Sequence, residues 1–213
     1  MDNPIWRELK SHAPFTLFGA VTAIALTFVL VLTRVELHAL KPFFEGFHAV
    51  HVLLSAIVTT AMYRRYRPNL IACVLIGYLG SVGIATLSDV VFPHHGGALI
   101  LKATGADVHM HFHLPVIEMW WLINPVALVG IGIALYRPTT KVPHSGHVLL
   151  STWASLFYLL TNAPESVRWL PLLPLVLVVL FVAVWLPCCV SDIVYPLLFV
   201  GKQGRVEEHH EHG

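Results

Sequence analysis

His48-Ala-Val-His51-Val-Leu-Leu-Ser55 is the stretch that decides the fold, because it occurs twice. It returns 96 positions later as His144-Ser-Gly-His-Val-Leu-Leu-Ser151. The match extends in both directions at the same offset, with eight identities in the 27-residue window from 42 to 68. The chain therefore contains an internal repeat.

Two further pairs of segments resemble each other at slightly different offsets, so insertions fall between the repeated elements. The segment 14–19 resembles 125–130, and 88–93 resembles 191–196. A chance match is the alternative in so apolar a chain. The identical histidines, serines, aspartates and prolines favour a repeat.

The composition is that of a membrane protein. Apolar residues make up 56% of the 213 positions, whereas soluble domains average about 45–50% even with glycine counted. Charged residues make up only 12%, about half the usual share. The net charge is +1 and no basic patch occurs, so we expect no nucleic-acid partner. The three cysteines lie in apolar runs, which argues against a disulfide framework.

Six apolar runs are long enough to cross a hydrocarbon core, which takes roughly 20 helical residues. They predict an all-α integral membrane protein, with 1–213 as a single multipass domain. Repeat 1 covers about 12–93 and repeat 2 about 115–200, and a histidine-rich cytoplasmic tail follows at 201–213. The expected spans are 14–34, 43–63, 69–92, 115–136, 146–163 and 169–200.

Lysine and arginine in short loops indicate the orientation, because positive residues are retained in the cytoplasm. Nine of them fall on one side and four on the other when the spans alternate. We therefore expect a protein of the cell (inner) membrane with both termini cytoplasmic. Each repeat holds three spans, an odd number, so the copies run in opposite senses. The prediction is a six-transmembrane 3+3 inverted repeat, a plan typical of secondary transporters.

The two histidine pairs, His48 with His51 and His144 with His147, can each present two imidazoles on one helix face. Neutral imidazoles suit Zn, Ni, Co, Cu or Fe rather than Mg or Ca. The pairs could form two layers on one path or converge on one central site. The alternative is that they brace helices through hydrogen bonds.

Each repeat has one aspartate near the end of its third span. Asp89 and Asp192 could each complete a His-His-Asp metal site. Alternatively, each caps a helix end or pairs with a loop cation.

A second concentration of ligand side chains follows the third span. A histidine-rich tract usually indicates metal capture, and histidine titrates near neutral pH. This segment is interpreted as an entry funnel, an outer metal site or a pH sensor, and the tail at 207–212 as a loose metal-holding tract. The residues are His94, His95, His109, His111, His113 and Glu118.

Glu45 lies three residues before His48, the spacing of di-iron bundles. Its repeat mate is Lys141, so only an accessory ligand role remains for Glu45. Cys188 and Cys189 could be soft ligands for an ion that leaves the protein. We favour their interpretation as small buried hydrophobes.

The sequence favours a membrane transporter or channel for a divalent transition-metal ion over an enzyme. Zinc is the first choice, and Ni, Co, Fe or Cu are the others. An integral membrane metalloenzyme, a zinc hydrolase or metal-dependent oxidoreductase with an outer histidine-rich site, is the alternative. A haem b protein held by His51 and His147 is the third. The expected partners are the metal ion and the lipid bilayer, with homo-oligomerisation left open.

Overall fold

The computed structural model describes residues 4–66, 69–105, 110–137, 141–189 and 195–199. The side chains at 4–9, 11, 141–145, 189 and 196–197 lie outside this description. Within the described residues every regular element is a helix, and no strand occurs. This confirms the all-helical prediction.

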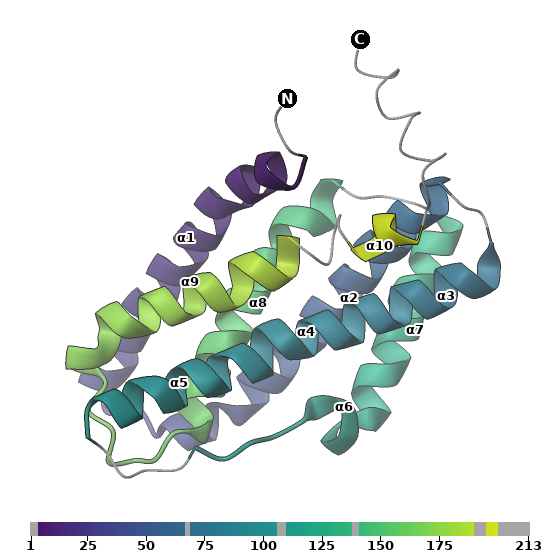
Figure 1. The fold of residues 1–213 in the computed structure, drawn as a ribbon. Helices are drawn as coiled ribbons and strands as arrows, with labels where there is room; N and C mark the ends of the chain where they lie inside the picture. The colour runs from purple at the N-terminus through teal and green to yellow at the C-terminus, as the bar shows by residue number, and fades with distance from the viewer. Residues whose placement is uncertain (1–3, 67–68, 106–109, 138–140, 190–194, 200–213) are drawn as a thin grey trace.

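The order of the helices along the chain is shown in Figure 1. Their bounds are α1 Pro4–Leu32, η1 Leu37–Leu40, α2 Lys41–Tyr66, α3 Leu70–Tyr78, η2 Leu79–Gly83, α4 Ile84–Thr86, η3 Leu87–Val91, α5 Phe92–Ala103, α6 Pro115–Glu118, α7 Trp120–Tyr136, α8 Lys141–Asn162, η4 Leu170–Leu172, α9 Leu173–Cys189 and α10 Tyr195–Leu198.

Four helices are long and apolar enough to cross a membrane. Their apolar segments are His12–Leu32, Leu37–Tyr66, Leu70–Ala103 and Leu170–Cys188. A fifth, α7, is apolar but shorter, with 17 residues. The 22-residue α8 carries several polar residues on its buried side. The described residues therefore contain four candidate spans, which agree with the prediction of a membrane protein, whereas the predicted six spans are not confirmed.

The elements from α3 to α5 form one continuous helix from Leu70 to Ala103. The predicted third span, 69–92, ends too early, because the helix continues over the next eleven residues, 93–103. Two π-helical segments, η2 and η3, interrupt the α-helix. Pro93 lies in the first turn of α5, directly after η3, where its missing N–H is tolerated.

The predicted last span, 169–200, is also too long as a single element. It begins with the 3₁₀ turn η4, and α9 ends at Cys189. The short α10 follows at Tyr195–Leu198, and 190–194 lie outside the described residues.

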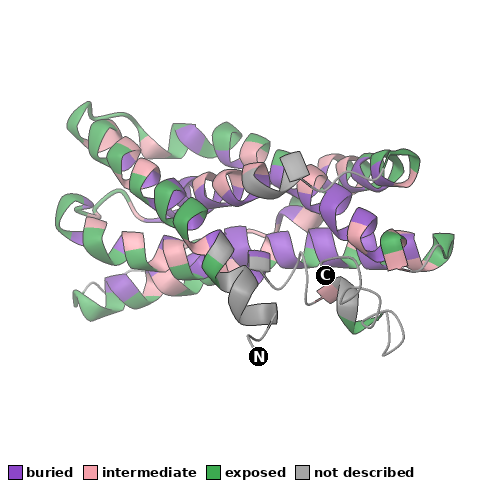
Figure 2. Ribbon diagram, turned by 90° about the horizontal axis from the view of Figure 1, so that it is seen from above, coloured by how far each residue is buried: buried purple, intermediate pink, exposed green. Residues whose placement is uncertain are grey.

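The central elements are α2 and α8, which pack against each other along their length. Helix α1 covers α8 and α9, and α7 covers α2 and α3. Figure 2 shows buried residues toward the middle of the bundle and exposed residues on its outer sides and ends. On α2, every residue from 55 to 61 is buried. The polar side chains in the middle of α2 and α8, such as His51 and Ser151, are therefore buried between helices.

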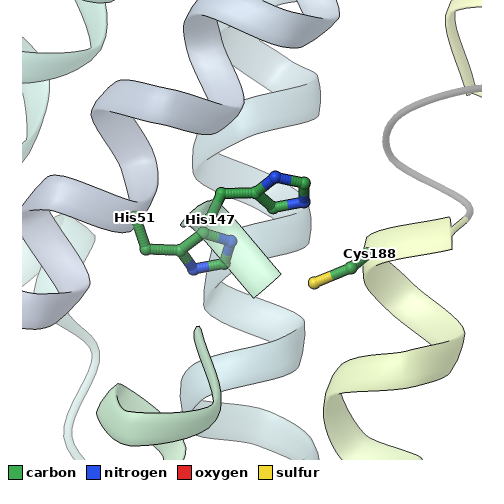
Figure 3. Close-up of side chains that lie close together, drawn as sticks. All are labelled: His51, His147 and Cys188. Carbon is green, nitrogen blue, oxygen red and sulfur yellow. The ribbon is translucent and has the colours of Figure 1, made fainter. Parts of the chain in front are cut away.

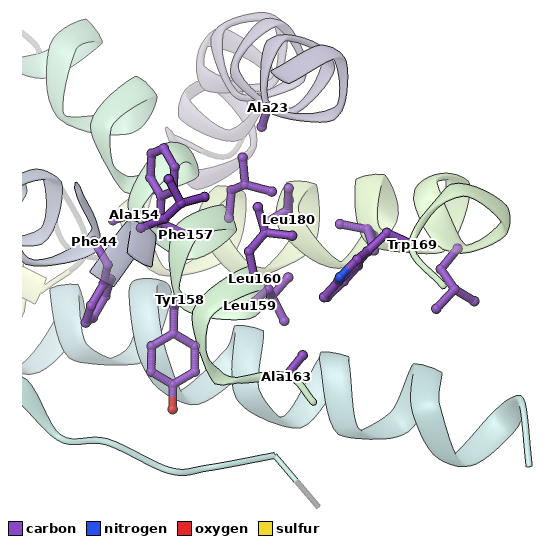
Figure 4. Close-up of a cluster of buried hydrophobic side chains, with 14 of the residues drawn as sticks. Ala23, Phe44, Ala154, Phe157, Tyr158, Leu159, Leu160, Ala163, Trp169 and Leu180 are labelled. Atoms are coloured by element: carbon purple, nitrogen blue, oxygen red, sulfur yellow. The ribbon is translucent and has the colours of Figure 1, made fainter. Parts of the chain in front are cut away.

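The largest apolar cluster surrounds the second half of α8 (Figure 4). Tyr158 and Leu180 are fully buried in it, and Phe44 of α2 meets the Tyr158 ring edge-on at a centroid distance of 5.4 Å. Threonine hydroxyls in the helices bond to carbonyls of their own turn, as Thr152 does to Val148 (2.8 Å). Such bonds satisfy polar groups within the helix, as an apolar surrounding requires.

We predict that Gly130→Ala separates α7 from α2. A Cβ at Gly130 would lie 2.6 Å from the carbonyl oxygen of Leu53 and 2.8 Å from Cβ of Ala56. A backbone atom cannot move aside, so the expected loss of unfolding free energy is about 1–3 kcal/mol. Thermal unfolding of the purified protein in detergent measures it. The control is Gly132→Ala, because a Cβ there meets nothing within 4 Å. Equal stability of the two variants would contradict the prediction.

Candidate metal centre

His48 and His51 lie on one face of α2, one helical turn apart, as their spacing predicts. Both are buried, with exposed fractions of 0% and 2%. Nδ1 of His48 lies 2.9 Å from Oδ2 of Asp89, and Nδ1 of His51 lies 2.7 Å from the same oxygen. The pair therefore converges on one carboxylate oxygen.

Asp89 belongs to the π-helical segment η3 and is fully buried. Its second oxygen, Oδ1, accepts hydrogen bonds from the hydroxyls of Ser88 (2.8 Å) and Ser151 of α8 (2.6 Å). Four polar groups from α2, η3 and α8 thus surround one carboxylate. Hydrogen bonds of this kind favour the ionised form of the carboxyl group and offset the cost of its burial.

The carboxylate also sets the tautomers of the two rings. An ionised carboxylate only accepts hydrogen bonds, so Nδ1 of His48 and of His51 must each carry the proton. In the neutral ring the lone pair then lies on Nε2, the form that binds a metal. Nε2 of His48 is buried and has no hydrogen-bond partner among the described residues. Its ring stacks on that of Phe44, at a centroid distance of 5.6 Å.

His51 meets His147 of α8 face to face. The ring centroids are 5.7 Å apart and the ring planes differ by 9°. Cys188, near the end of α9, points toward the two rings (Figure 3). One ligand atom from each of the three side chains lies within 4.8 Å of the other two. All three are buried, with at most 2% exposed.

These three side chains form the only group of three or more potential metal ligands within that distance in the described part of the chain. Imidazole nitrogen and thiolate sulfur suit Zn²⁺, with bond lengths of about 2.0–2.3 Å. Tetrahedral coordination at those lengths separates ligands by about 3.5 Å, so small side-chain movements would close the group on an ion. A fourth coordination position remains for water or a further ligand.

The residues predicted to form an outer site are arranged in smaller sets. Nδ1 of His113 bonds to the carboxylate of Glu118 (2.8 Å). His94 packs against Phe112, and its Nδ1 lies 3.4 Å from the hydroxyl of Tyr158. These contacts join α5, the segment before α6 and α8 at one end of the bundle.

Other predicted ligands do not join a larger group. Nδ1 of His95 donates to the carbonyl of Val91 in its own helix (2.7 Å). His111 is exposed, and its backbone N–H bonds to the carbonyl of Asn162 (3.1 Å). Glu45 is half-buried, one turn before His48, and is not part of the His51, His147 and Cys188 group.

Some predicted site residues fall outside the described residues: Asp192, His109 and the side chain of His144. The same is true of the tail at 201–213 and of the side chain of Cys189. The roles expected for them stay predictions.

Cys188 is buried among apolar residues, as the sequence predicts, and it also lies near two histidines, which no local spacing indicates. Ser88 and Ser155 were not among the predicted site residues. Ser88 precedes Asp89 directly, and Ser155 donates to the carbonyl of Ser88 (2.9 Å). A signal for Ser155 does exist, because it lies two helical turns after His147 on the same face of α8.

No protein-family model, curated protein or solved structure matches the chain. The function must therefore be argued from the site alone.

We predict that Asp89→Asn weakens transition-metal binding by about 10–100-fold, the usual effect of losing a carboxylate that orients a ligating histidine. An amide can donate as well as accept, so it no longer fixes both Nδ1 protons. Titration calorimetry with Zn²⁺ on the purified protein measures the change. Ser81→Ala is the matched control, because Ser81 is equally buried in the same helix and bonds only to the carbonyl of Tyr78. Unchanged affinity in Asp89→Asn would contradict the prediction.

Proposed function

We propose that this protein lies in a membrane and carries a divalent transition-metal ion across it, with Zn²⁺ as the first candidate. The observation that carries the proposal is the buried group of His51, His147 and Cys188. Three different helices, α2, α8 and α9, supply one ligand each. Ligands on separate helices can be brought together or drawn apart when helices move.

The packing of the helices supports an inverted repeat. In the sequence, Gly19 is the mate of Gly130, and Leu149 and Thr152 are the mates of Leu53 and Ala56. A Cβ at Gly19 would meet Thr152 at 3.0 Å and Leu149 at 3.5 Å. A Cβ at Gly130 would meet Leu53 and Ala56, so equivalent glycines face equivalent residues.

The contacts between whole helices are also equivalent in the two halves. Helix α1 packs on α8 and α9, and α7 packs on α2 and α3. The stacked rings of His51 and His147 are themselves repeat mates and lie where the halves meet. In inverted-repeat transporters that interface holds the substrate site, and one half moves against the other.

The repeat also extends the proposal to residues outside the described part. Asp192 and His144 are the mates of Asp89 and His48. Their expected roles as metal ligands stay predictions, and Zn²⁺ binding by Asp192→Asn tests whether the second carboxylate contributes.

A buried polar stripe leads from the metal group toward the histidines of the outer loop. On α8, Ser151 and Ser155 follow His147 at successive turns, and Tyr158 continues the series. The Tyr158 hydroxyl accepts a hydrogen bond from the backbone N–H of His113 (3.3 Å). We propose that an ion gathered near His113 and Glu118 follows this stripe to the centre.

An enzyme is less well supported than a transporter. The hydroxyls of Ser88 and Ser151 donate to Asp89, whereas a serine nucleophile is hydrogen-bonded to its general base. A metalloenzyme would need room for a substrate beside the metal. A cavity of about 370 Å³ lies at the end of α1, and none of its lining residues belongs to the metal group. A haem between His51 and His147 would need a flat slot between rings that stack on each other.

Metal content tests the binding site. We predict that detergent-purified protein supplied with Zn²⁺ holds close to one ion per chain, and that His51→Ala, His147→Ala and Cys188→Ala each lose most of it. His95→Ala and Cys73→Ala are the controls, because His95 is exposed and Cys73 lies on α3, outside the ligand group. Elemental analysis gives the stoichiometry. Metal retained by all three ligand variants would overturn the assignment.

Reconstituted vesicles test transport separately from binding. We predict Zn²⁺ uptake into proteoliposomes, monitored with an enclosed fluorescent chelator, and its loss in His51→Ala and Cys188→Ala. Uptake should fall as the pH is lowered, because protons compete with the metal for imidazole and thiolate. If the protein binds Zn²⁺ but moves it neither into nor out of the vesicles, transport is excluded and the protein only binds the metal.

A further inference from the structure

A cavity of about 370 Å³ lies at the end of the bundle where α1 ends and α8 gives way to η4. This volume falls within the range of small-molecule sites, about 300–1,000 Å³. Its inner wall is apolar and includes the buried Leu160 and Trp169. Its rim is charged and includes Arg34, Glu36 and Glu165. None of these residues belongs to the metal centre.

Arg34 takes an unusual backbone conformation to reach this rim. Its φ is +54°, the one left-handed non-glycine residue in the described part of the chain. The N–H of Val35 bonds to the carbonyl of Leu30 and that of Arg34 to Val31, which closes the end of α1. Glycine is the residue that normally ends a helix in this way. An arginine held there against its backbone preference points to a role for its side chain.

The other polar groups of the cavity are oriented by the surrounding helices. Nδ1 of His38 lies 2.8 Å from the carbonyl of Thr161 in α8, so it donates there. Nε2 of His38 then faces Glu165, at 3.9 Å from Oε1. Glu165 is 82% exposed, and Glu36 is exposed as well. Their carboxylates are therefore free to accept hydrogen bonds from a ligand at the rim.

We propose that this cavity binds the headgroup of a phospholipid that carries a primary ammonium beside its phosphate, as an ethanolamine phospholipid does. The Arg34 guanidinium pairs with the phosphate. The carboxylates of Glu36 and Glu165 accept hydrogen bonds from the ammonium, which a trimethylated choline headgroup cannot donate.

The location fits a lipid rather than a soluble molecule. The apolar part of α1 ends at Leu32, so the cavity lies where a membrane-crossing helix would leave the hydrocarbon. Trp169, an aromatic residue typical of that boundary, lines the wall. Val31 and the exposed Val35 also line the cavity, and acyl chains would lie against them. Lipid binding at this cavity requires that the protein lies in a membrane, but it does not require that the protein transports metal.

Native mass spectrometry of the delipidated full-length protein tests the proposal. The probes are an ethanolamine phospholipid and a choline phospholipid with the same acyl chains. We expect the wild type to bind the ethanolamine lipid in preference, and Arg34→Gly to weaken that binding at least about tenfold through loss of a charge-assisted pair. Glu165→Gln should reduce the preference for ethanolamine over choline.

The variant Arg34→Gly suits the backbone at this position, so its unfolding midpoint should not fall below that of the wild type. Lys102→Ala removes an exposed cation at the end of α5, outside the cavity lining, and should leave lipid binding unchanged. Equal binding of the two lipids by the wild type, or undiminished binding by Arg34→Gly, would overturn the proposal. So would Arg34-dependent binding of inorganic phosphate with no binding of either lipid, because the site would then take a free anion.

Discussion

The buried carboxylate of Asp89 is the constraint on which the rest of the centre depends. An ionised carboxylate without partners is very costly in an apolar interior. Here two imidazoles and two hydroxyls donate to it, and they come from α2, η3 and α8. The carboxylate therefore ties three helices together at one point. It also fixes how each imidazole is rotated, which is what a metal ligand requires.

The π-helical turns explain how one residue can reach so many partners. A π-turn adds a residue to the helix and shifts the side chains that follow it, and such turns are frequent at functional sites. Ser88 and Asp89 both lie in η3. On α8, the hydroxyl of Ser151 donates to the Asp89 carboxylate, and the hydroxyl of Ser155 donates to the backbone carbonyl of Ser88. The irregular backbone is thus satisfied by a neighbouring helix, as buried irregular structure in an apolar surrounding must be.

Local periodicity made the histidine pair and its carboxylate predictable. An i, i+3 spacing places two side chains on one helix face whatever the tertiary fold. The internal repeat singled out both histidine pairs and also Asp89. The partner Cys188 could not be found in this way, because it lies 137 positions from His51 in the sequence and only the packing of α9 brings it near. The extension of the third helix past Pro93 was missed for a related reason. Proline normally predicts a helix boundary, but a preceding π-turn places it at the start of a new α-helical segment.

The fold class could be predicted from the sequence because composition and the length of apolar runs are averages over many residues. The contact between His51 and His147 could not, because it depends on how α2 and α8 cross at one point. The two histidines are repeat mates in the sequence, so in the proposed transporter a movement of one half against the other would change the contact between their rings. Conduction of an ion requires binding that is strong enough to capture it and weak enough to release it. Three ligands on three helices would meet both conditions, because a shift of α9 would withdraw the thiolate while Asp89 holds His51 in place. The carboxylate would then be the fixed side of the proposed site, and Cys188 the side that opens.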